Sequence, residues 1–403
     1  MTRRLEAWLD GGHVGQFIID GDTTYFRYDT DAPDTPISLS LPRTGTATKR
    51  AAANFLENLL PDHEHTRVRL AATYGARSTD TVELLEKAGG DIAGGLVLVP
   101  EGTEPVSAAA ELNPAVDRDV ADRIRSIKHD PDAWAPRNLP ARFSLAGTQG
   151  KFAIASVDGD WYWSNASLPS THIVKPGRPD LRCVEDAEVA ALRLARAAGI
   201  GAPAANILRV DDQHAFIVER FDRIRDPGVP IPRRLHAEDL AQARGLNPDR
   251  KYGVTARQVV ESLRPVDTSG KLVRTFLMQL AFNALVGNAD AHAKNYSILL
   301  QQNTISVAPM YDVVPVGLYP SYDQKLAMRI GGARFAAEVT IHHWRKLART
   351  SGLDENEVTD VVVGVATRVL EHNDTSWDTL ADNQRNIVRD SIARNAERLR
   401  ADM

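Results

Sequence analysis

The spacing of apolar residues changes along the chain and predicts two halves of different structure. Apolar and polar residues alternate in three short runs near the amino terminus, Leu5–Leu9, Val14–Ile19 and Thr24–Tyr28, and this alternation is typical of β-strands. The pairs Gly11-Gly12 and Gly21-Asp22 separate these runs and favour hairpin turns. We therefore expect an antiparallel sheet at the start of the chain.

Helical spacing dominates later in the chain. Helices are predicted at Ala51–Leu60, Arg67–Tyr74, Thr81–Lys87, Asp117–Lys128, Asp186–Ala198, Ala237–Gly245, Ala256–Arg264, Lys271–Val286, Val339–Ser351, Glu355–His372 and Trp377–Arg400. Further strands are predicted at Leu96–Val99, Lys151–Val157, His172–Lys175, Asn206–Val210, Ala215–Val218, Tyr296–Leu300 and Thr304–Val307. The last two strands should turn at Gln302-Asn303, and residues 101–115, which lack an apolar period, mark a candidate boundary.

Composition limits the class of protein. The 403 residues are 43% apolar and 25% charged, so the chain can bury a large core in more than one domain. Its 48 basic and 53 acidic residues give a net charge of −5, which argues against a general attraction for nucleic acid. The single Cys183 excludes an internal disulfide framework. We expect a cytoplasmic protein, because the amino terminus has no apolar signal core and Phe276–Val286 is too short to span a bilayer.

The segment from Gly287 to Tyr296 carries the strongest chemical signal. Asp290 and Asn295 lie five positions apart, the spacing of the kinase catalytic loop, in which the Asp accepts the substrate hydroxyl proton and the Asn holds Mg²⁺. A second metal carboxylate is needed, and Asp312 follows the predicted hairpin that brings the chain back towards this loop. The sequence therefore predicts a phosphoryl-transfer centre.

The first half offers residues that would complete such a centre. The loop Ala146–Lys151 contains two glycines before a strand, which lets backbone N–H groups approach phosphate oxygens, although an ordinary turn is the simpler reading. Lys175 ends a predicted strand, and Glu188 faces inward on the helix that should begin at a cap residue, Asp186. We expect Lys175 and Glu188 to form the kinase ion pair, the alternative being a solvated Glu188 in a frayed first turn.

Two more segments could contact a nucleotide. The strand exit Glu219-Arg220-Phe221 resembles the hinge at which kinases bind adenine through the main chain, whereas a solvated strand end is the plain alternative. His292 lies between Asp290 and Asn295, and we interpret it as bracing the loop, because Mg²⁺ prefers oxygen ligands.

In these residues the chain resembles the HipA family, bacterial serine/threonine kinases that act as toxins of type II toxin–antitoxin systems. The resemblance runs nearly from end to end. Its motifs are Phe55–Pro61, Ser144–Lys151, Thr171–Lys175, Val218–Arg223, Arg234–His236, Asn288–Ser297, Tyr311-Asp312 and Lys325–Met328. Each is weak alone, but their order and spacing together are specific.

The resemblance implies an α+β, two-lobed protein-kinase-like fold: residues 1–115 as an amino-terminal β-rich subdomain, 116–221 as the lobe with the nucleotide loop, and 222–403 as an all-α carboxy-terminal lobe. It implies Asp290 as the catalytic base, Asn295 and Asp312 as Mg²⁺ ligands, and Lys175 and Lys294 as phosphate contacts. The ATP site that it implies comprises Ala146, Gly147, Thr148, Gln149, Gly150, Lys151, Lys175, Glu219, Arg220, Phe221, His292, Ala293, Lys294, Asn295, Tyr311 and Asp312.

Ser144 occupies the position of the serine that the family autophosphorylates, a change that ejects the nucleotide loop and inactivates the kinase. About two added negative charges there would repel ATP phosphates. A serine that merely caps the loop is the alternative. The chain departs from the family at Gly150, where an acidic residue is usual before the loop lysine.

The leading hypothesis is therefore an ATP- and Mg²⁺-dependent serine/threonine kinase toxin restrained by a HipB-like helix-turn-helix antitoxin, which would supply DNA contact indirectly. Its protein substrate would be a translation component such as an aminoacyl-tRNA synthetase, with glutamyl-tRNA synthetase as the guess from the resemblance. A nucleotide-binding pseudokinase or co-repressor scaffold is the second hypothesis, and a small-molecule or lipid kinase is the third.

Overall fold

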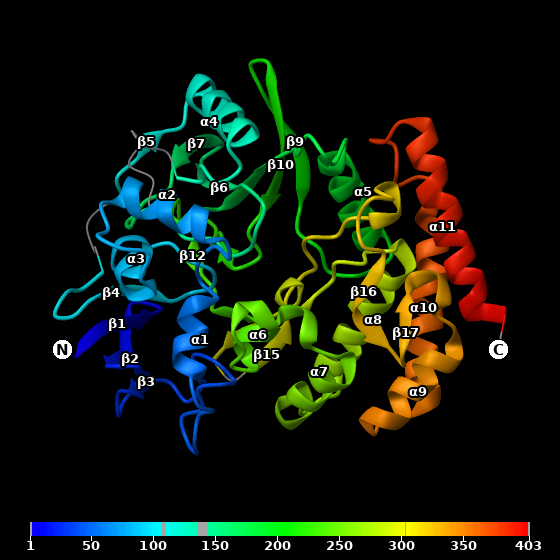
Figure 1. The fold of residues 1–403 in the computed structure, drawn as a ribbon, viewed down its shortest axis with the longest axis horizontal. Coiled ribbons are helices and arrows are strands. Elements are labelled where there is room, and N and C mark those ends of the chain that lie inside the picture. The colour runs from blue at the N-terminus through cyan, green and yellow to red at the C-terminus, as the bar shows by residue number, and fades with distance from the viewer. Residues whose placement is uncertain (1, 106–109, 136–142, 303, 402–403) are drawn as a thin grey trace. The chain divides into compact units, whose positions relative to one another are not determined.

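The computed structural model describes residues 2–105, 110–135, 143–302 and 304–401 (Figure 1). The first unit comprises Met1–Gly177, Ile207–Asp249 and Leu299–Thr304, and the second comprises Arg178–Asn206, Arg250–Ile298 and Ile305–Met403. Neither residue 115 nor residue 221 bounds a unit, so the three-part division stays a prediction. Asn303 of the expected turn, and 106–109 within the expected boundary, lie outside the described residues.

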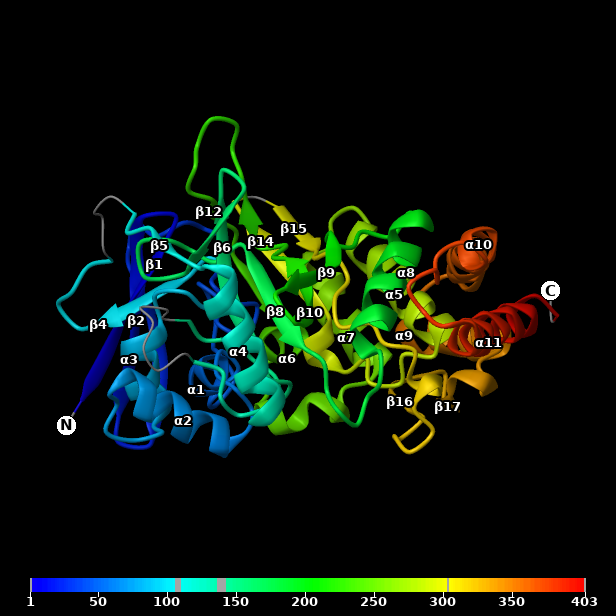
Figure 2. The same cartoon turned by 90° about the horizontal axis from the view of Figure 1, so that it is seen from above.

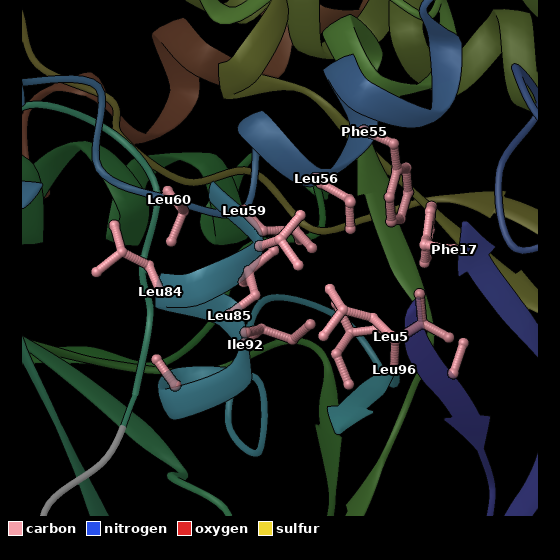
Figure 3. Close-up of a cluster of buried hydrophobic side chains, with 14 of the residues drawn as sticks. Leu5, Phe17, Phe55, Leu56, Leu59, Leu60, Leu84, Leu85, Ile92 and Leu96 are labelled. Atoms are coloured by element: carbon pink, nitrogen blue, oxygen red, sulfur yellow. The ribbon is translucent and has the colours of Figure 1, made fainter. Parts of the chain in front are cut away.

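The first unit opens with the expected antiparallel sheet, in the order β3-β2-β1-β4. Its strands are β1 (Arg3–Leu9), β2 (Gly12–Asp20), β3 (Thr23–Tyr28) and β4 (Val97–Pro100). The neighbouring helices are α1 (Ala51–Glu57), α2 (Glu64–Tyr74) and α3 (Thr81–Ala88). Figure 3 shows the apolar side chains that join sheet and helices, among them Leu5 and Phe17 from the strands and Phe55 and Leu85 from the helices. This core holds the sheet and the three helices of the amino-terminal part together.

A second sheet of the first unit carries the predicted nucleotide-binding strands. Its order is β5-β7-β6-β8-β10-β9. The strands are β5 (Asn113–Pro114), β6 (Phe152–Val157), β7 (Asp160–Trp163), β8 (His172–Pro176), β9 (Ala205–Val210) and β10 (Gln213–Glu219). Helix α4 (Asp117–His129) packs on β8 and β10 and buries Ile124 and Ile127 against them. The strand predictions for this region are confirmed.

The helix predicted at Ala237–Gly245 is wrong for its first turn. Short strands β11 (Arg223–Ile224) and β12 (Arg233–Arg234) are followed by β13 (Ala237–Asp239) and only one turn of helix, α6 (Leu240–Ala243). Strand β13 pairs with β14 (Ser297–Gln301), and the Leu300 N–H donates to the His236 carbonyl at 2.9 Å. Sheet pairing, made by residues far away in the sequence, therefore overrides the local helical pattern.

The second unit is mainly helical. Its helices are α5 (Val184–Ala197), α7 (Ala256–Leu263), α8 (Lys271–Val286), α9 (Ile341–Ser351), α10 (Glu355–Asn373) and α11 (Asp382–Ala401). Helix α10 packs against α5, α8, α9 and α11, and Figure 2 shows α10 and α11 side by side. Short 3₁₀ helices occur at η1 (Pro248–Gly253), which begins in the first unit, and at η2 (Arg264–Val266), η3 (Ala293–Asn295), η4 (Val316–Leu318) and η5 (Ala336–Glu338). The mainly helical character expected of this part is confirmed, but the expectation of an all-α lobe over 222–403 is wrong, because paired strands, β11 to β14 among them, lie in that range.

Strands also occur among the helices of the carboxy-terminal part. Strands β14 and β15 (Thr304–Val307) form the expected hairpin, whereas the pattern did not predict β16 (Lys325–Ile330) and β17 (Ala333–Phe335). No helix in the described part of the chain has the length and apolar character needed to cross a membrane.

Several predicted helix starts differ from the structure: α2 begins at Glu64 rather than Arg67, and α9 begins at Ile341 rather than Val339. Helix α5 begins at Val184, whose side chain is buried, so Asp186 lies in the first turn rather than at the cap, which is Cys183. Helix α11 begins at Asp382 rather than Trp377. The Trp377 carbonyl instead accepts a hydrogen bond from Arg385 Nε at 3.2 Å, which satisfies this backbone group outside the helix.

Candidate functional site

The catalytic-loop sequence follows directly from a helix end in the second unit. Helix α8 stops at Gly287, which has φ +70°, a conformation that glycine adopts at little cost. The Asn288 side-chain amide then donates to Asn283 Oδ1 at 3.0 Å and to the Asp312 carbonyl at 3.1 Å. Sequence reasoning assigned no role to Asn288, although its position beside Asp290 could have drawn attention to it. This buried amide ties the loop to the segment of the second expected metal carboxylate.

Asp290 and Asp312 lie near each other within the second unit. The residue Asp290 reaches the surface, but its carboxylate is partly enclosed by neighbouring groups and accepts a hydrogen bond from the Tyr252 hydroxyl at 3.0 Å. Partial burial raises the pKa of Asp290, and the negative charge of Asp312 raises it further, whereas Tyr252 and Lys251 act in the opposite direction. Two neighbouring carboxylates of this kind favour a divalent cation between or beside them.

The backbone at Asp312 is unusual. Its φ is +57°, in the left-handed region that only a few non-glycine residues adopt, aspartate among them. Such conformations cost about 1–3 kcal/mol and persist where the surroundings enforce them, often at functional sites. The Asn288 amide on the Asp312 carbonyl is one such constraint. The aspartate is thus held in a strained turn that sets the direction of its side chain.

The remaining loop residues are fixed by short backbone contacts. The His292 N–H donates to the Asp290 carbonyl at 2.7 Å, and the Asn295 N–H donates to the His292 carbonyl at 2.9 Å. The Tyr311 hydroxyl donates to the Lys294 carbonyl at 2.7 Å, which fastens the loop to the residue before Asp312. Asp290, His292, Ala293, Lys294, Asn295, Tyr311 and Asp312 therefore belong to one local structure, and their roles in binding phosphate and metal stay a prediction.

The chemistry of these donors suits Mg²⁺. Asn295 and Asp312, the expected ligands, offer amide and carboxylate oxygens, which Mg²⁺ prefers. Across the described residues, no group of three or more His, Cys, Asp or Glu side chains is arranged to hold a metal. A site built from one amide and one carboxylate has fewer side chains of these types than such a group, and its oxygen donors suit Mg²⁺, Ca²⁺ or Mn²⁺ rather than metals that prefer nitrogen or sulfur. His292 fits the bracing role expected of it, since its ring meets Tyr252 edge-on with centroids 5.0 Å apart.

The expected nucleotide loop, Ala146–Lys151, lies in the first unit and is folded back on itself. Lys151 Nζ donates to the Ala146 carbonyl at 2.9 Å and lies 5.2 Å from the centre of the Trp134 ring. Gly147 has φ +100°, and its carbonyl accepts the Asp62 N–H at 3.0 Å. The two loop glycines thus allow a compact turn, with Thr148 and Gln149 between them.

Gly150 has a steric reason for departing from the acidic residue that the family resemblance implies. A Cβ atom at this position would lie 2.6 Å from Ile127 Cγ2 and 2.8 Å from the Pro131 carbonyl oxygen. Real Cβ contacts are almost never this short, and the carbonyl belongs to rigid backbone. The local packing of this chain therefore demands glycine before the loop lysine.

Ser144 is buried at the base of the loop, with 1% of its surface exposed. Its hydroxyl donates to the Leu59 carbonyl at 2.8 Å, and its N–H donates to the Asp91 carbonyl at 3.0 Å. A phosphate cannot be attached to this hydroxyl while it is enclosed, so modification would require the loop to leave this position. Arg142, just before the motif, lies outside the described residues. Autophosphorylation at Ser144 stays a prediction.

Lys175 occupies strand β8, opposite Phe216 of β10, and its ammonium lies 5.3 Å from the centre of the Phe216 ring. Glu188 is buried on helix α5 of the second unit. Because the two residues belong to different units, their ion pair stays a prediction.

The expected hinge contains a buried ion network that sequence reasoning missed. The Arg220 guanidinium bonds to both carboxylate oxygens of Asp222, at 2.9 and 2.7 Å, and Arg223 Nη2 bonds to Asp91 Oδ1 at 2.9 Å. The Arg220 N–H donates to the Thr171 carbonyl at 2.8 Å. Arg220 can therefore offer a nucleotide only its main-chain carbonyl, beside Glu219 and Phe221. The adjacent arginine and aspartate in the motif were the available signal.

Arg220, Arg223 and Arg234 lower the pKa of Asp91, against the opposing effect of its burial. Asp91 Oδ2 also accepts the Ser170 N–H at 3.2 Å. Through its carbonyl and carboxylate, Asp91 thus joins Ser144, at the base of the nucleotide loop, to the hinge.

Comparison with known proteins places these features in one family. Residues 5–99 match the HipA N-terminal domain, and residues 143–373 match the HipA-like C-terminal domain. The chain is 35% identical to Y4mE of Sinorhizobium fredii, provisionally named a kinase, over 99% of both proteins. It is 30% identical to the serine/threonine-protein kinase toxin HipA of Shewanella oneidensis, over 82% of this chain and 79% of that protein.

Solved structures agree. The chain resembles HipA in a complex of Shewanella oneidensis HipA, HipB and operator DNA, with a TM-score of 0.81 and 27% identity over 98% of this chain and 97% of that one. The match supports the kinase-like fold that the motifs predicted. With both of its domains matched and a relative of 35% identity spanning its length, the chain belongs to the HipA family.

Proposed function

We propose that this protein is an ATP- and Mg²⁺-dependent serine/threonine protein kinase and the toxin of a HipBA-like toxin–antitoxin system. The observation that carries the proposal is the catalytic loop: Asp290 beside Asp312, with Asn295 in the same loop and Asn288 bonded to the Asp312 carbonyl. Members of this family with kinase names support the reaction class. The proposal places the protein in the cytoplasm, where ATP and the translation machinery are found.

Each residue has a defined task in the proposed reaction. Asp290 accepts the hydrogen bond, and then the proton, of the acceptor hydroxyl. Asn295 and Asp312 provide oxygen ligands for Mg²⁺, and Lys175 and Lys294 contact phosphates, with Glu188 orienting Lys175. The loop Ala146–Lys151 covers the phosphates. ATP supplies the phosphoryl group, and Mg²⁺ neutralises the charge that develops during its transfer.

The proposed partner is a HipB-like helix-turn-helix antitoxin, through which the protein would contact operator DNA. The solved complex of the Shewanella oneidensis relative with HipB and DNA supports this assignment. The net charge of −5 is consistent with DNA contact through a partner rather than through the toxin alone. We further propose a translation component, such as an aminoacyl-tRNA synthetase, as the acceptor, and Ser144 as an autophosphorylation site.

The direct test uses the purified full chain, Mg²⁺ and γ-labelled ATP with a cell lysate as the source of acceptors. Asp290→Asn should reduce labelled protein by at least about 100-fold, since general-base catalysis contributes roughly 10²–10⁴-fold. The matched control is Asp323→Asn, an exposed carboxylate of the same unit paired with Lys325, which should label normally. Equal labelling by wild type and Asp290→Asn would end the assignment. ATP binding without any transfer would favour the scaffold, and label confined to metabolites would favour a small-molecule kinase.

A further inference from the structure

Tyr252 is an exposed aromatic residue that is hydrogen-bonded to the expected catalytic base, Asp290. It lies in the 3₁₀ turn η1, with 54% of its surface exposed. Its hydroxyl donates to Asp290 Oδ1 at 3.0 Å, and its ring meets His292 edge-on at 86°. The Lys251 ammonium lies 5.4 Å from the centre of the same ring. All four residues belong to the second unit, so this arrangement is complete within it.

The bond from Tyr252 has the chemistry of a kinase acceptor. A serine or threonine substrate must present an O–H group to the base within about 2.6–3.2 Å before its proton can be taken. The phenol of Tyr252 already provides an O–H donor to Asp290 at that distance. A hydroxyl from a substrate and the hydroxyl of Tyr252 therefore compete for the same carboxylate.

The exposed position of Tyr252 would allow its side chain to turn away from Asp290. A tyrosine ring that served only the core would be buried, whereas more than half of this one faces solvent. Turning its side chain outward would break the bond to Asp290 without opening a cavity in a core.

We propose that the Tyr252 hydroxyl takes the place of the acceptor hydroxyl at Asp290 until a protein acceptor displaces it. While it is bound there, it keeps water from reaching Asp290 and being phosphorylated. The inference rests on the proposed kinase function and adds a residue that controls acceptor access. No comparison or motif assigns Tyr252 this role.

Displacement of Tyr252 exchanges one hydrogen bond to Asp290 for another. The Tyr252 O–H to Asp290 hydrogen bond breaks, and the acceptor O–H donates to Asp290 in its place. The acceptor oxygen then bonds to the γ-phosphorus of ATP, the bond from that phosphorus to the bridging oxygen of ADP breaks, and the acceptor proton passes to Asp290. With water as the acceptor, the same step yields ADP and inorganic phosphate. Tyr252 itself forms no covalent bond.

The test measures ADP release by the full chain with Mg²⁺ and ATP in the absence of a protein acceptor. Tyr252→Phe keeps the ring and removes the hydroxyl, so we expect ATP hydrolysis to rise about three- to ten-fold, the equivalent of one hydrogen bond partly exposed to water. Tyr252→Ala should raise it as well. The control is Tyr25→Phe, an exposed tyrosine of strand β3 in the other unit, which should leave hydrolysis unchanged.

Because Tyr252→Phe keeps the ring that meets His292, faster hydrolysis by this variant reports the loss of the hydroxyl rather than the loss of packing. If wild type transfers phosphate but neither Tyr252 variant hydrolyses ATP faster, the inference fails and the proposed function stands. Phosphate found on Tyr252 by mass spectrometry would make this residue an acceptor and would also overturn the inference. If neither wild type nor any variant turns over ATP, the proposed function fails and the inference falls with it.

Discussion

Glu238 of the first unit allows a quantitative prediction of how protein stability depends on pH. Its side chain is buried, with 2% of the residue exposed, and Oε1 accepts the Leu39 N–H at 2.8 Å. Ser38 is a second polar neighbour of the carboxyl group, and its hydrogen bond and that of the Leu39 N–H oppose the effect of burial on its pKa. Burial raises the pKa of Glu238 to about 8, and the charge of Asp239 adds to this effect. The folded protein therefore holds Glu238 in its neutral form at physiological pH.

The sign of the pH dependence follows from proton binding. The folded state keeps the proton of Glu238 up to about pH 8, whereas the unfolded chain releases it near the ordinary value of 4.5. Between these values the unfolded state binds fewer protons, so the free energy of unfolding falls as the pH rises. The loss is about 1.4 kcal/mol per pH unit well below pH 8 and becomes smaller as Glu238 ionises in the folded state, so it is about 2 kcal/mol between pH 6 and pH 8.

Glu238→Gln should abolish this loss, because glutamine keeps the shape of the neutral acid and does not ionise. Denaturant unfolding of both proteins at pH 6 and pH 9 measures the difference, and the variant should gain about 3 kcal/mol relative to wild type over that range. The exposed Glu104→Gln is the control and should follow wild type. If Glu238→Gln lost stability as steeply as wild type, a buried neutral Glu238 would be refuted.

Two further substitutions test the supports of the nucleotide loop and the hinge. Asp91→Asn should lower the free energy of unfolding by about 3–5 kcal/mol, because it leaves buried guanidinium groups of Arg223 and its neighbours short of a carboxylate; a loss below about 1 kcal/mol in denaturant unfolding would contradict this. Gly150→Ala should cost about 1–3 kcal/mol, because its Cβ would overlap Ile127 and the Pro131 carbonyl. It should also raise the KM for ATP by moving the loop, and an unchanged KM with unchanged stability would show that the loop tolerates a side chain.

Patterns within short stretches of the sequence predicted the elements that depend on residues close together in the chain. Strand alternation found β1, β2 and β3, and the five-residue spacing found Asp290 and Asn295 because both lie in one short loop after helix α8. The prediction that Asp312 would return to that loop also depended on a local hairpin, β14 and β15. These elements are governed by neighbours within a few tens of residues, which a single sequence displays.

Contacts between distant segments could not be read in the same way. Asp91 meets Arg223 across more than a hundred residues, and Tyr252 reaches Asp290 from a turn 38 residues earlier. The segment from Ala237 has helical spacing but becomes a strand, since a remote partner strand satisfies its backbone. Such pairings depend on the assembled fold, which periodicity alone does not report.

The buried ion network gives the first unit a connection that the motifs did not suggest. Asp91 accepts from Ser144 through its carbonyl and from Arg223 and Ser170 through its carboxylate. Release of Ser144 from its enclosed position would therefore break a bond at the same residue that anchors the hinge. A movement of Ser144 would therefore also affect the contacts of Asp91 with the expected hinge that follows Glu219.

The most direct test of the central claim compares the phosphoproteomes of cells expressing wild type and the Asp290→Asn variant at equal levels. The account predicts new phosphoserine or phosphothreonine sites in a few proteins with wild type, and their absence with the variant. The same sites at the same occupancy with both proteins, or no new protein phosphorylation with either, would contradict a protein kinase whose base is Asp290.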